Sequence, residues 1–376
     1  MRVLWNELKK ILTWKMLVLL IFINSVLYFL LIEFYIENFP NGSGIYSYEM
    51  GIEMIEKYGT TMDEEEFIDF KKAYANQVEE ATQYLQSREE FVEVGLDTYE
   101  EFLAYDWWNA PQEIDELRSD VFINEKVDLF WELQERESLI RFYEGRKTIP
   151  HVLSEKKRQR FEELIAQEKF GVYPEVVMMN FKSFIANVAI AILFSVVLVI
   201  SPTIVKDRTR QVVAIQYTTR KGRNLFKTKL LAGSIATFIL ITALLIVYFS
   251  LYSLNNTSMY FDVRVNTFIA NESWFDPTFF QFILLCVAGI YIIGLVFGLL
   301  SMVFSSLVPN MVSLIGIQIP FVVGFLLIGL YPLVPHMISI WNSKWLALIA
   351  YSVMILLTLV GAIMLWKREK KMDIVL

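Results

Sequence analysis

Six long apolar blocks constrain the fold of this chain more than any other feature of its sequence. About 20 residues of α-helix are needed to cross the hydrocarbon core of a bilayer. The blocks cover residues 16–36, 184–205, 230–254, 279–303, 311–331 and 345–366. A turn signal at Pro309-Asn310 separates the fourth block from the fifth. The sequence therefore predicts an all-α membrane protein with six transmembrane helices.

The charged residues divide the chain into two regions of opposite sign. Residues 41–180 contain 32 acidic and 15 basic residues, a net charge of −17, whereas the rest of the chain contains 9 acidic and 19 basic residues. Such an asymmetry indicates two environments. We expect residues 40–180 to form a mostly helical domain outside the membrane.

The positions of the basic residues predict the orientation of the spans. Of the 19 lysines and arginines outside the acidic domain, 16 lie in residues 1–15, 206–229 and 367–376. With six spans these three segments fall on one side, and the positive-inside rule makes that side the cytoplasm. We expect a multi-pass protein of a bacterial cell membrane, with cytoplasmic termini and an extracellular acidic domain.

Helical periodicity is visible inside the acidic domain. Apolar residues recur at intervals of three and four from Phe67 to Leu85, and Thr61 or Asp63 is placed to cap that helix. Two further helices are predicted around residues 127–142 and 161–165. For the Trp107-Trp108 pair, packing in the core of the domain is favoured over contact with a ligand or the membrane. For the acidic run 63–66, a solvated helix start is favoured over cation binding.

Several single residues limit the chemistry. Cys286 lies in an apolar block and predicts a buried thiol, while His151 and His336 are too far apart in sequence to suggest a metal site. The proline residues at 202 and 320 are expected to kink the second and fifth spans. Gly294 and Gly298 form a G-x-x-x-G motif, which packs helices either within the chain or between two copies of it.

The first 15 residues have the pattern of an amphipathic helix. Leu4, Leu8, Ile11 and Leu12 share one helical face, whereas Lys9 and Lys10 lie on the other side. Tryptophan prefers the headgroup layer, so Trp5 favours a helix that lies in the membrane surface. The simpler alternative is a short basic anchor.

The basic segment 206–229 also contains exposed apolar residues. Val212, Val213, Ile215 and Tyr217 stand among eight lysines and arginines. A basic, partly apolar helix is suited to docking on a cytoplasmic partner. The alternative is a loop that only sets the topology.

In layout and in this loop, the chain resembles the membrane subunits of ABC-2-type ABC transporters. Asp207 matches the acidic position of the family's loop, and Thr218-Thr219-Arg220 match the turn before its arginine, while Gln211 stands where glycine is usual. The resemblance implies that the loop is a coupling helix that docks on an ATPase subunit. It assigns that role to Asp207, Arg208, Arg210, Gln211, Tyr217, Arg220 and Arg223.

The resemblance implies a permease subunit that moves a hydrophobic or amphipathic peptide, lipid or drug out of the cell. The chain has no G-x-x-x-x-G-K-[ST] loop, so it is expected not to be an enzyme itself, and ATP and Mg²⁺ would be bound by the separate ATPase subunit. A second permease subunit is also expected, with a homodimer slightly favoured, and no nucleic acid. The alternatives are a sensor or immunity protein whose outer domain binds a peptide or antibiotic, and a secondary transporter, which the lack of mid-span charges disfavours.

The predicted orientation leads to a labelling experiment. A cysteine introduced at position 90 should react with a membrane-impermeant thiol reagent in intact cells, because residues 40–180 are expected outside. A cysteine at position 215 should react only after the cells are opened. The reverse pattern would contradict the predicted topology.

Overall fold

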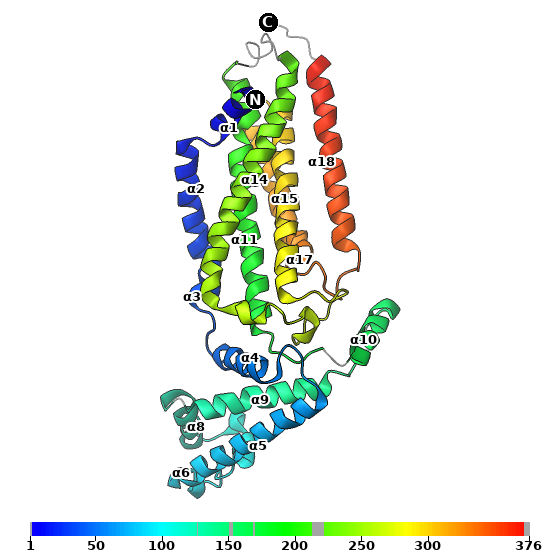
Figure 1. The fold of residues 1–376 in the computed structure, drawn as a ribbon. Coiled ribbons are helices and arrows are strands. Elements are labelled where there is room, and N and C mark those ends of the chain that lie inside the picture. The colour runs from blue at the N-terminus through cyan, green and yellow to red at the C-terminus, as the bar shows by residue number, and fades with distance from the viewer. Residues whose placement is uncertain (1, 126, 150–152, 168–169, 213–221, 372–376) are drawn as a thin grey trace. The chain divides into compact units, whose positions relative to one another are not determined.

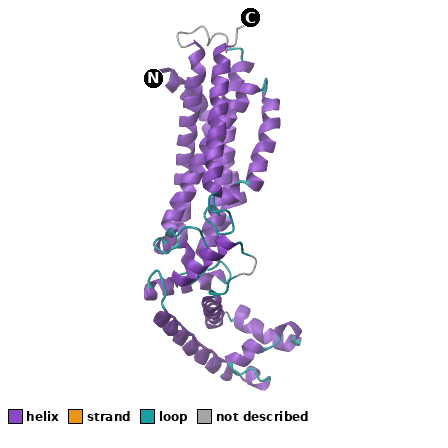
Figure 2. Ribbon diagram, turned by 90° about the vertical axis from the view of Figure 1, so that its right-hand side faces the viewer, coloured by secondary structure: helices purple, strands orange, loops and turns teal. Residues whose placement is uncertain are grey.

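The structure is a computed structural model that describes residues 2–125, 127–149, 153–167, 170–212 and 222–371. Every regular element in these ranges is a helix (Figures 1 and 2), so the predicted all-α class is confirmed. The chain forms two compact units. The first comprises Met1–Asn38, Met179–Asn256 and Phe280–Leu376, and the second comprises Phe39–Met178 and Thr257–Phe279.

The first unit is a bundle of apolar helices. Among the described residues, six helical segments are long and apolar enough to cross a membrane: Trp14–Ile32, Val176–Thr209, Leu225–Asn255, Phe279–Leu307, Met311–Ile328 and Leu346–Lys370. The prediction of six spans is confirmed, and the chain is a multi-pass membrane protein. The second and third helices begin earlier than their apolar blocks, because a helix continues its backbone hydrogen bonds into the polar residues at its ends.

Some spans of the bundle are continuous helices and others are divided by a short interruption. Their bounds are α1 Arg2–Ile11, α2 Trp14–Leu27, α3 Phe34–Glu37, α11 Val176–Ile200, α12 Pro202–Thr209, α14 Leu225–Tyr252, α15 Phe279–Leu307, α16 Met311–Ile328, α17 Leu330–Leu333 and α18 Leu346–Lys371. A π-helical turn, Tyr28–Ile32, joins α2 to α3. The second span is interrupted at Pro202, as predicted, because proline lacks the N–H that a helix interior needs. In contrast, α16 continues through Pro320.

Helix α11 is the best-buried span of the bundle. Its apolar window is 67% buried, whereas the windows of α2, α16 and α18 are between 11% and 17% buried. Phe181 and Phe184 of α11 contact Tyr252 of α14, and Phe181 also contacts Phe282 of α15. The outward faces of α2, α16 and α18 are apolar, as contact with lipid requires.

A polar contact holds α2 against this core. The Nδ2 of Asn24 donates to Ser195 Oγ of α11 at 2.9 Å, and Tyr248 of α14 donates to Asn24 Oδ1 at 2.8 Å. Hydrogen bonds between helices in a membrane contribute about 0.6 kcal/mol on average. Asn24 therefore joins three spans at a point where α2 has little other buried surface.

The two glycines of the G-x-x-x-G motif lie against α14 of the same chain. A methyl group built on Gly294 would lie 2.5 Å from Ile241 Cδ1, and one built on Gly298 would lie 2.5 Å from Thr237 Oγ1. A third close approach comes from Gly233 of α14, which packs on Met302 of α15. Small residues thus let α14 and α15 approach closely, which is the intrachain alternative for this motif.

The second unit is helical and contains an aromatic core. Its helices are α4 Gly44–Tyr58, α5 Glu64–Gln86, α6 Glu89–Glu93, α7 Tyr99–Ala104, α8 Gln112–Ser119, α9 Asp128–Gly145 and α10 Glu155–Gln167. Helices α5, α6, α7 and α9 contribute buried residues to the core. Asp63 caps α5 in a capping box with Glu66, so the acidic run is a helix start. The periodicity of α5 is confirmed, since Phe67, Phe70 and Leu85 are buried.

The tryptophan pair is divided between core and surface. Trp107 donates its Nε1–H to the Phe102 carbonyl at 3.0 Å and packs against the core. Trp108 is 98% exposed. The prediction of core packing is therefore right for Trp107 and wrong for Trp108, because a 3₁₀ turn over Trp107–Asn109 carries the two side chains apart.

The connection between the third and fourth spans belongs to the second unit, which the sequence did not indicate. Gly171 N donates to the Asn266 carbonyl at 2.9 Å, and Ile269 N donates to the Tyr173 carbonyl at 2.9 Å. Tyr260 is buried against Gly51 of α4. The second unit is therefore discontinuous in sequence, because residues 39–178 and residues 257–279 form it together.

The close packing of α14 on α15 makes a testable prediction. Gly298→Leu should destabilise the bundle by about 1–3 kcal/mol, because Thr237 leaves no room for a larger side chain. Gly316→Leu in α16 is the matched control, since nothing lies within 4 Å of a methyl group at that glycine. Thermal unfolding of the detergent-purified variants measures both changes. Equal melting temperatures for the two variants would contradict the described packing.

Candidate functional site at the α12 end of the bundle

Several basic segments of the chain meet at one end of the bundle. Figure 1 shows α1, the first turn of α14 and the last turn of α18 at this end. The connection from α15 to α16 lies there too, because Arg208 of α12 hydrogen-bonds to it. We call this the α12 end. The described parts of all three predicted basic segments therefore share one end of the bundle.

Helix α12 ends in a Schellman motif, a turn that satisfies the last carbonyls of a helix. Val212 N donates to the Asp207 carbonyl at 3.2 Å, and Gln211 N donates to the Arg208 carbonyl at 3.0 Å. Gln211 has a φ of +57°. This left-handed conformation is the one that glycine adopts without a steric cost. The position where the resembling family has glycine is thus a position where the backbone favours glycine.

A buried ion pair fixes α12 to α14. Lys229 Nζ lies 2.6 Å from Asp207 Oδ2, and the two side chains are only 6% and 14% exposed. Removing one partner of such a pair leaves an uncompensated buried charge, at a cost of about 3–5 kcal/mol. The Asp207 carboxylate therefore forms a contact within the chain, with Lys229.

Arg208 fixes α12 to the connection between α15 and α16. Its two terminal nitrogens donate to the carbonyls of Ser306, at 2.8 Å, and Val308, at 2.9 Å. These carbonyls lie at the C-terminal end of α15, where the helix dipole favours a cation. In the opposite direction, Val205 N in the first turn of α12 also donates to Ser305 Oγ at 2.9 Å. Helix α12 is therefore tied to the α15–α16 connection by side chains from both partners.

Helix α1 packs along α14 and contributes a buried carboxylate. Glu7 is 4% exposed, and Lys10 Nζ lies 2.8 Å from its Oε1. The residues predicted for the membrane surface lie on the outer part of the helix: Trp5 and Lys9 are exposed, Leu8 is half-buried, and Lys9 Nζ lies 5.4 Å from the Trp5 ring centroid. Sequence reasoning missed Glu7, whose spacing from Ile11 places both on the buried face.

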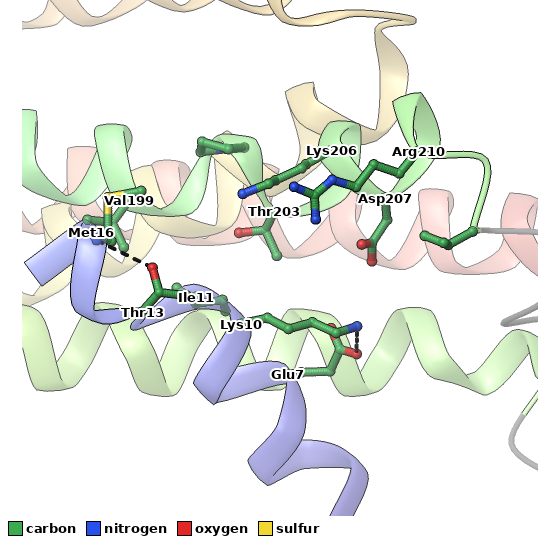
Figure 3. Close-up of a pocket in the computed structure, with 12 residues that line it drawn as sticks. Glu7, Lys10, Ile11, Thr13, Met16, Val199, Thr203, Lys206, Asp207 and Arg210 are labelled. Atoms are coloured by element: carbon green, nitrogen blue, oxygen red, sulfur yellow. Dashed lines mark hydrogen bonds and ion pairs between the residues drawn. The ribbon is translucent and has the colours of Figure 1, made fainter.

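A cavity of about 520 Å³ lies between α1 and the α11–α12 junction. Figure 3 shows Lys206 and Arg210 from α12 on one wall, and Glu7 and Lys10 from α1 on the other. Ile11, Met16, Val199 and Pro202 supply an apolar part of the lining. The cavity is thus lined by charged groups on one part and by apolar groups on another.

A second hollow lies within the span region, between α11 and α16. It has a volume of about 310 Å³ and is lined almost entirely by apolar side chains, among them Phe194, Leu198, Ile315 and Val322. Gln318 also lines it and is 6% exposed, and its Nε2 donor makes no hydrogen bond within the described residues. We call this hollow the α11–α16 groove.

The predicted coupling residues divide into three groups. Asp207 and Arg208 make internal contacts that fix α12, whereas Arg210 and Gln211 are exposed. Tyr217 and Arg220 lie outside the described residues, and only the backbone of Arg223 is described, in the 3₁₀ turn Gly222–Asn224. No pattern in the sequence marks Lys229 as the partner of Asp207, because the pair joins two helices across 22 residues.

Comparison of the chain with protein-family models, with curated proteins and with solved structures gives no match in any of the three. Within the described residues, no group of three or more His, Cys, Asp or Glu side chains could hold a metal ion. The function is therefore argued from the geometry at the α12 end.

The buried ion pair makes a prediction about stability. Asp207→Leu should cost about 3–5 kcal/mol of unfolding free energy, because Lys229 keeps its charge without a partner. The double variant Asp207→Leu/Lys229→Met should regain most of this loss. Asp69→Leu is the comparison, since Asp69 pairs with Lys57 at the same distance of 2.6 Å but in an exposed position; it should lower the stability much less than Asp207→Leu does. Thermal unfolding in detergent measures all three, and a double variant no more stable than Asp207→Leu would contradict the ion pair.

Proposed function

We propose that this chain is the membrane-spanning subunit of an ATP-driven exporter of the ABC-2 type. ATP is bound and hydrolysed by a separate ATPase subunit that docks at the α12 end. The observation that supports this most directly is the double attachment of α12, by Asp207 to α14 and by Arg208 to the α15–α16 connection. The resemblance assigns ATPase docking to the segment from Asp207 to Arg223, which begins in α12.

The double attachment supports a mechanical link. A partner that docked on the residues at the end of α12 would load α12 directly, because the hydrogen bonds of the Schellman motif hold Gln211 and Val212 to the last turn of that helix. A displacement of α12 would be transmitted to α14 through the buried ion pair of Asp207 with Lys229. It would be transmitted to the α15–α16 connection through the two hydrogen bonds of Arg208. Domains and helices that move as packed units transmit such displacements.

The proposed sidedness follows from charge. The α12 end carries the basic segments, so the positive-inside rule assigns it to the cytoplasm. The second unit is acidic, and the chain enters it after α3 and leaves it into α11, at the other end of those spans. This arrangement makes the second unit extracellular.

The α11–α16 groove supports a hydrophobic or amphipathic substrate. Its volume and apolar lining are within the range of small-molecule sites, and Gln318 supplies one amide for orientation. The poorly buried outer faces of α2 and α16 also suit a contact with a second permease subunit. A homodimer is the simplest form of such an assembly.

The test is to purify the tagged chain from native membranes in mild detergent and to measure the ATPase that copurifies. Arg220→Glu/Arg223→Glu should abolish copurification, because reversed charge at a docking surface repels the partner. Arg208→Ala should retain the ATPase but lower substrate-stimulated ATP turnover by about tenfold, since α12 loses its contact with α15. The substrate panel consists of amphipathic peptides and lipids.

Arg141→Glu is the matched control for charge reversal. Arg141 lies in α9 of the second unit and its side chain is 75% exposed, so this variant should keep both the ATPase and its turnover. Full docking and turnover in Arg220→Glu/Arg223→Glu would show that the loop only sets topology and would refute the proposal. A chain that carries no ATPase and binds a peptide through the second unit would favour the sensor or immunity function.

A further inference from the structure

The cavity at the α12 end has the lining expected for an amphiphile. Its charged part comes from α1 and α12 and its apolar part from Ile11, Met16 and Val199. A site for a small soluble anion has no need of the apolar part. A site for a purely apolar molecule has no need of the charges, which are costly to desolvate.

The cavity is lined by three cations and two carboxylates, and both carboxylates are already paired with a lysine. Glu7 is paired with Lys10 at 2.8 Å, and Asp207 is paired with Lys229 at 2.6 Å. Lys206 and Arg210 form no ion pair with any residue in the described part of the chain. A lysine and an arginine on the same short helix, facing one cavity, are the side chains that bind phosphate.

Two tryptophans indicate the level of the cavity in the bilayer. Trp5 of α1 and Trp14, the first residue of α2, are both exposed. Exposed tryptophan side chains prefer the headgroup layer, where the ring is apolar and the N–H is hydrated. The cavity lies between these two helices and the α11–α12 junction, so its charged part is at headgroup level.

We infer that this cavity binds an anionic phospholipid of the adjacent leaflet. Lys206 and Arg210 contact the phosphate, and the start of the acyl chains lies along Met16 and Val199. The bound lipid bridges α1 and α12, which the described contacts do not join directly through an ion pair. This inference is independent of the proposed function, because it requires no ATPase and no transport.

The test uses the full chain, purified in detergent without added lipid. Native mass spectrometry measures the binding of phosphatidylglycerol, phosphatidylcholine and dioleoylglycerol with the same acyl chains. One phosphatidylglycerol molecule per chain should bind most tightly, because only that lipid carries both a phosphate and a net negative charge. Lys206→Gln/Arg210→Gln should weaken this binding by at least about tenfold, as expected for the loss of two basic residues at a membrane surface.

Two further variants separate the site from general surface charge. Lys227→Gln/Lys370→Gln removes the same charge at the same end of the bundle, from side chains that lie over Trp366 at 5.6 and 4.2 Å; it should leave the tight binding unchanged. Lys206→Arg/Arg210→Lys keeps the charge and should keep the binding. Gel filtration confirms that each variant is folded.

Three outcomes would overturn the inference. An equal loss in both glutamine variants would mean that lipid binds to surface charge alone. Equal binding of phosphatidylcholine would remove the argument from net charge. Inorganic phosphate that displaces the tight lipid at millimolar concentration, or a photocrosslinker at Thr203 that captures protein and no lipid in native membranes, would assign the cavity to a free anion or to a protein segment.

Discussion

The absence of water in the core of a bilayer is the constraint on which the rest of this structure depends. Every backbone N–H and C=O in a span needs a partner inside the chain, and a continuous α-helix supplies all of them. Each interruption therefore needs a substitute donor or acceptor. Next to the break at Pro202, the hydroxyl of Ser305 in α15 accepts from Val205 N in the first turn of α12. Pairing of this kind turns a helix break into a fixed contact between two spans.

The same constraint explains where polar side chains lie within the bundle. Asn24, Ser195 and Tyr248 face one another, so the amide of α2 is satisfied by two neighbouring helices. Asp207 and Lys229 likewise neutralise each other near the α12 end. Such pairs add little net stability over an apolar replacement, but they specify which helices are neighbours. Uniformly apolar helix surfaces can pack against one another in several ways, and these polar contacts select one arrangement of the helices.

The sequence predicted the six spans because a run of 20 apolar residues is a local signal. It also predicted the cap and periodicity of α5, which depend on residues a few positions apart. It did not predict the partner of Asp207, the burial of Glu7, or the separation of Trp107 from Trp108. The spacing of Glu7 from Ile11 places both on one helical face, but that the helix buries this face against α14 depends on a contact between distant segments, as does the Asp207–Lys229 pair. The separation of Trp107 from Trp108 depends on a 3₁₀ turn that the sequence pattern does not encode. Part of the predicted coupling loop, including Tyr217 and Arg220, lies outside the described residues, so its role stays a prediction.

The discontinuous second unit has a consequence for the order of events during synthesis. Residues 39–178 emerge from the ribosome before α11, but Tyr260 and the partners of Tyr173 lie beyond α14. The aromatic core around α5 and α9 can form early, because all of its residues precede the second span. The face of α4 around Gly51 stays only partly covered until two more spans have been inserted. A fragment cut at residue 180 would keep Pro174 against Gly51 but would lack Tyr260, so it could not complete that face.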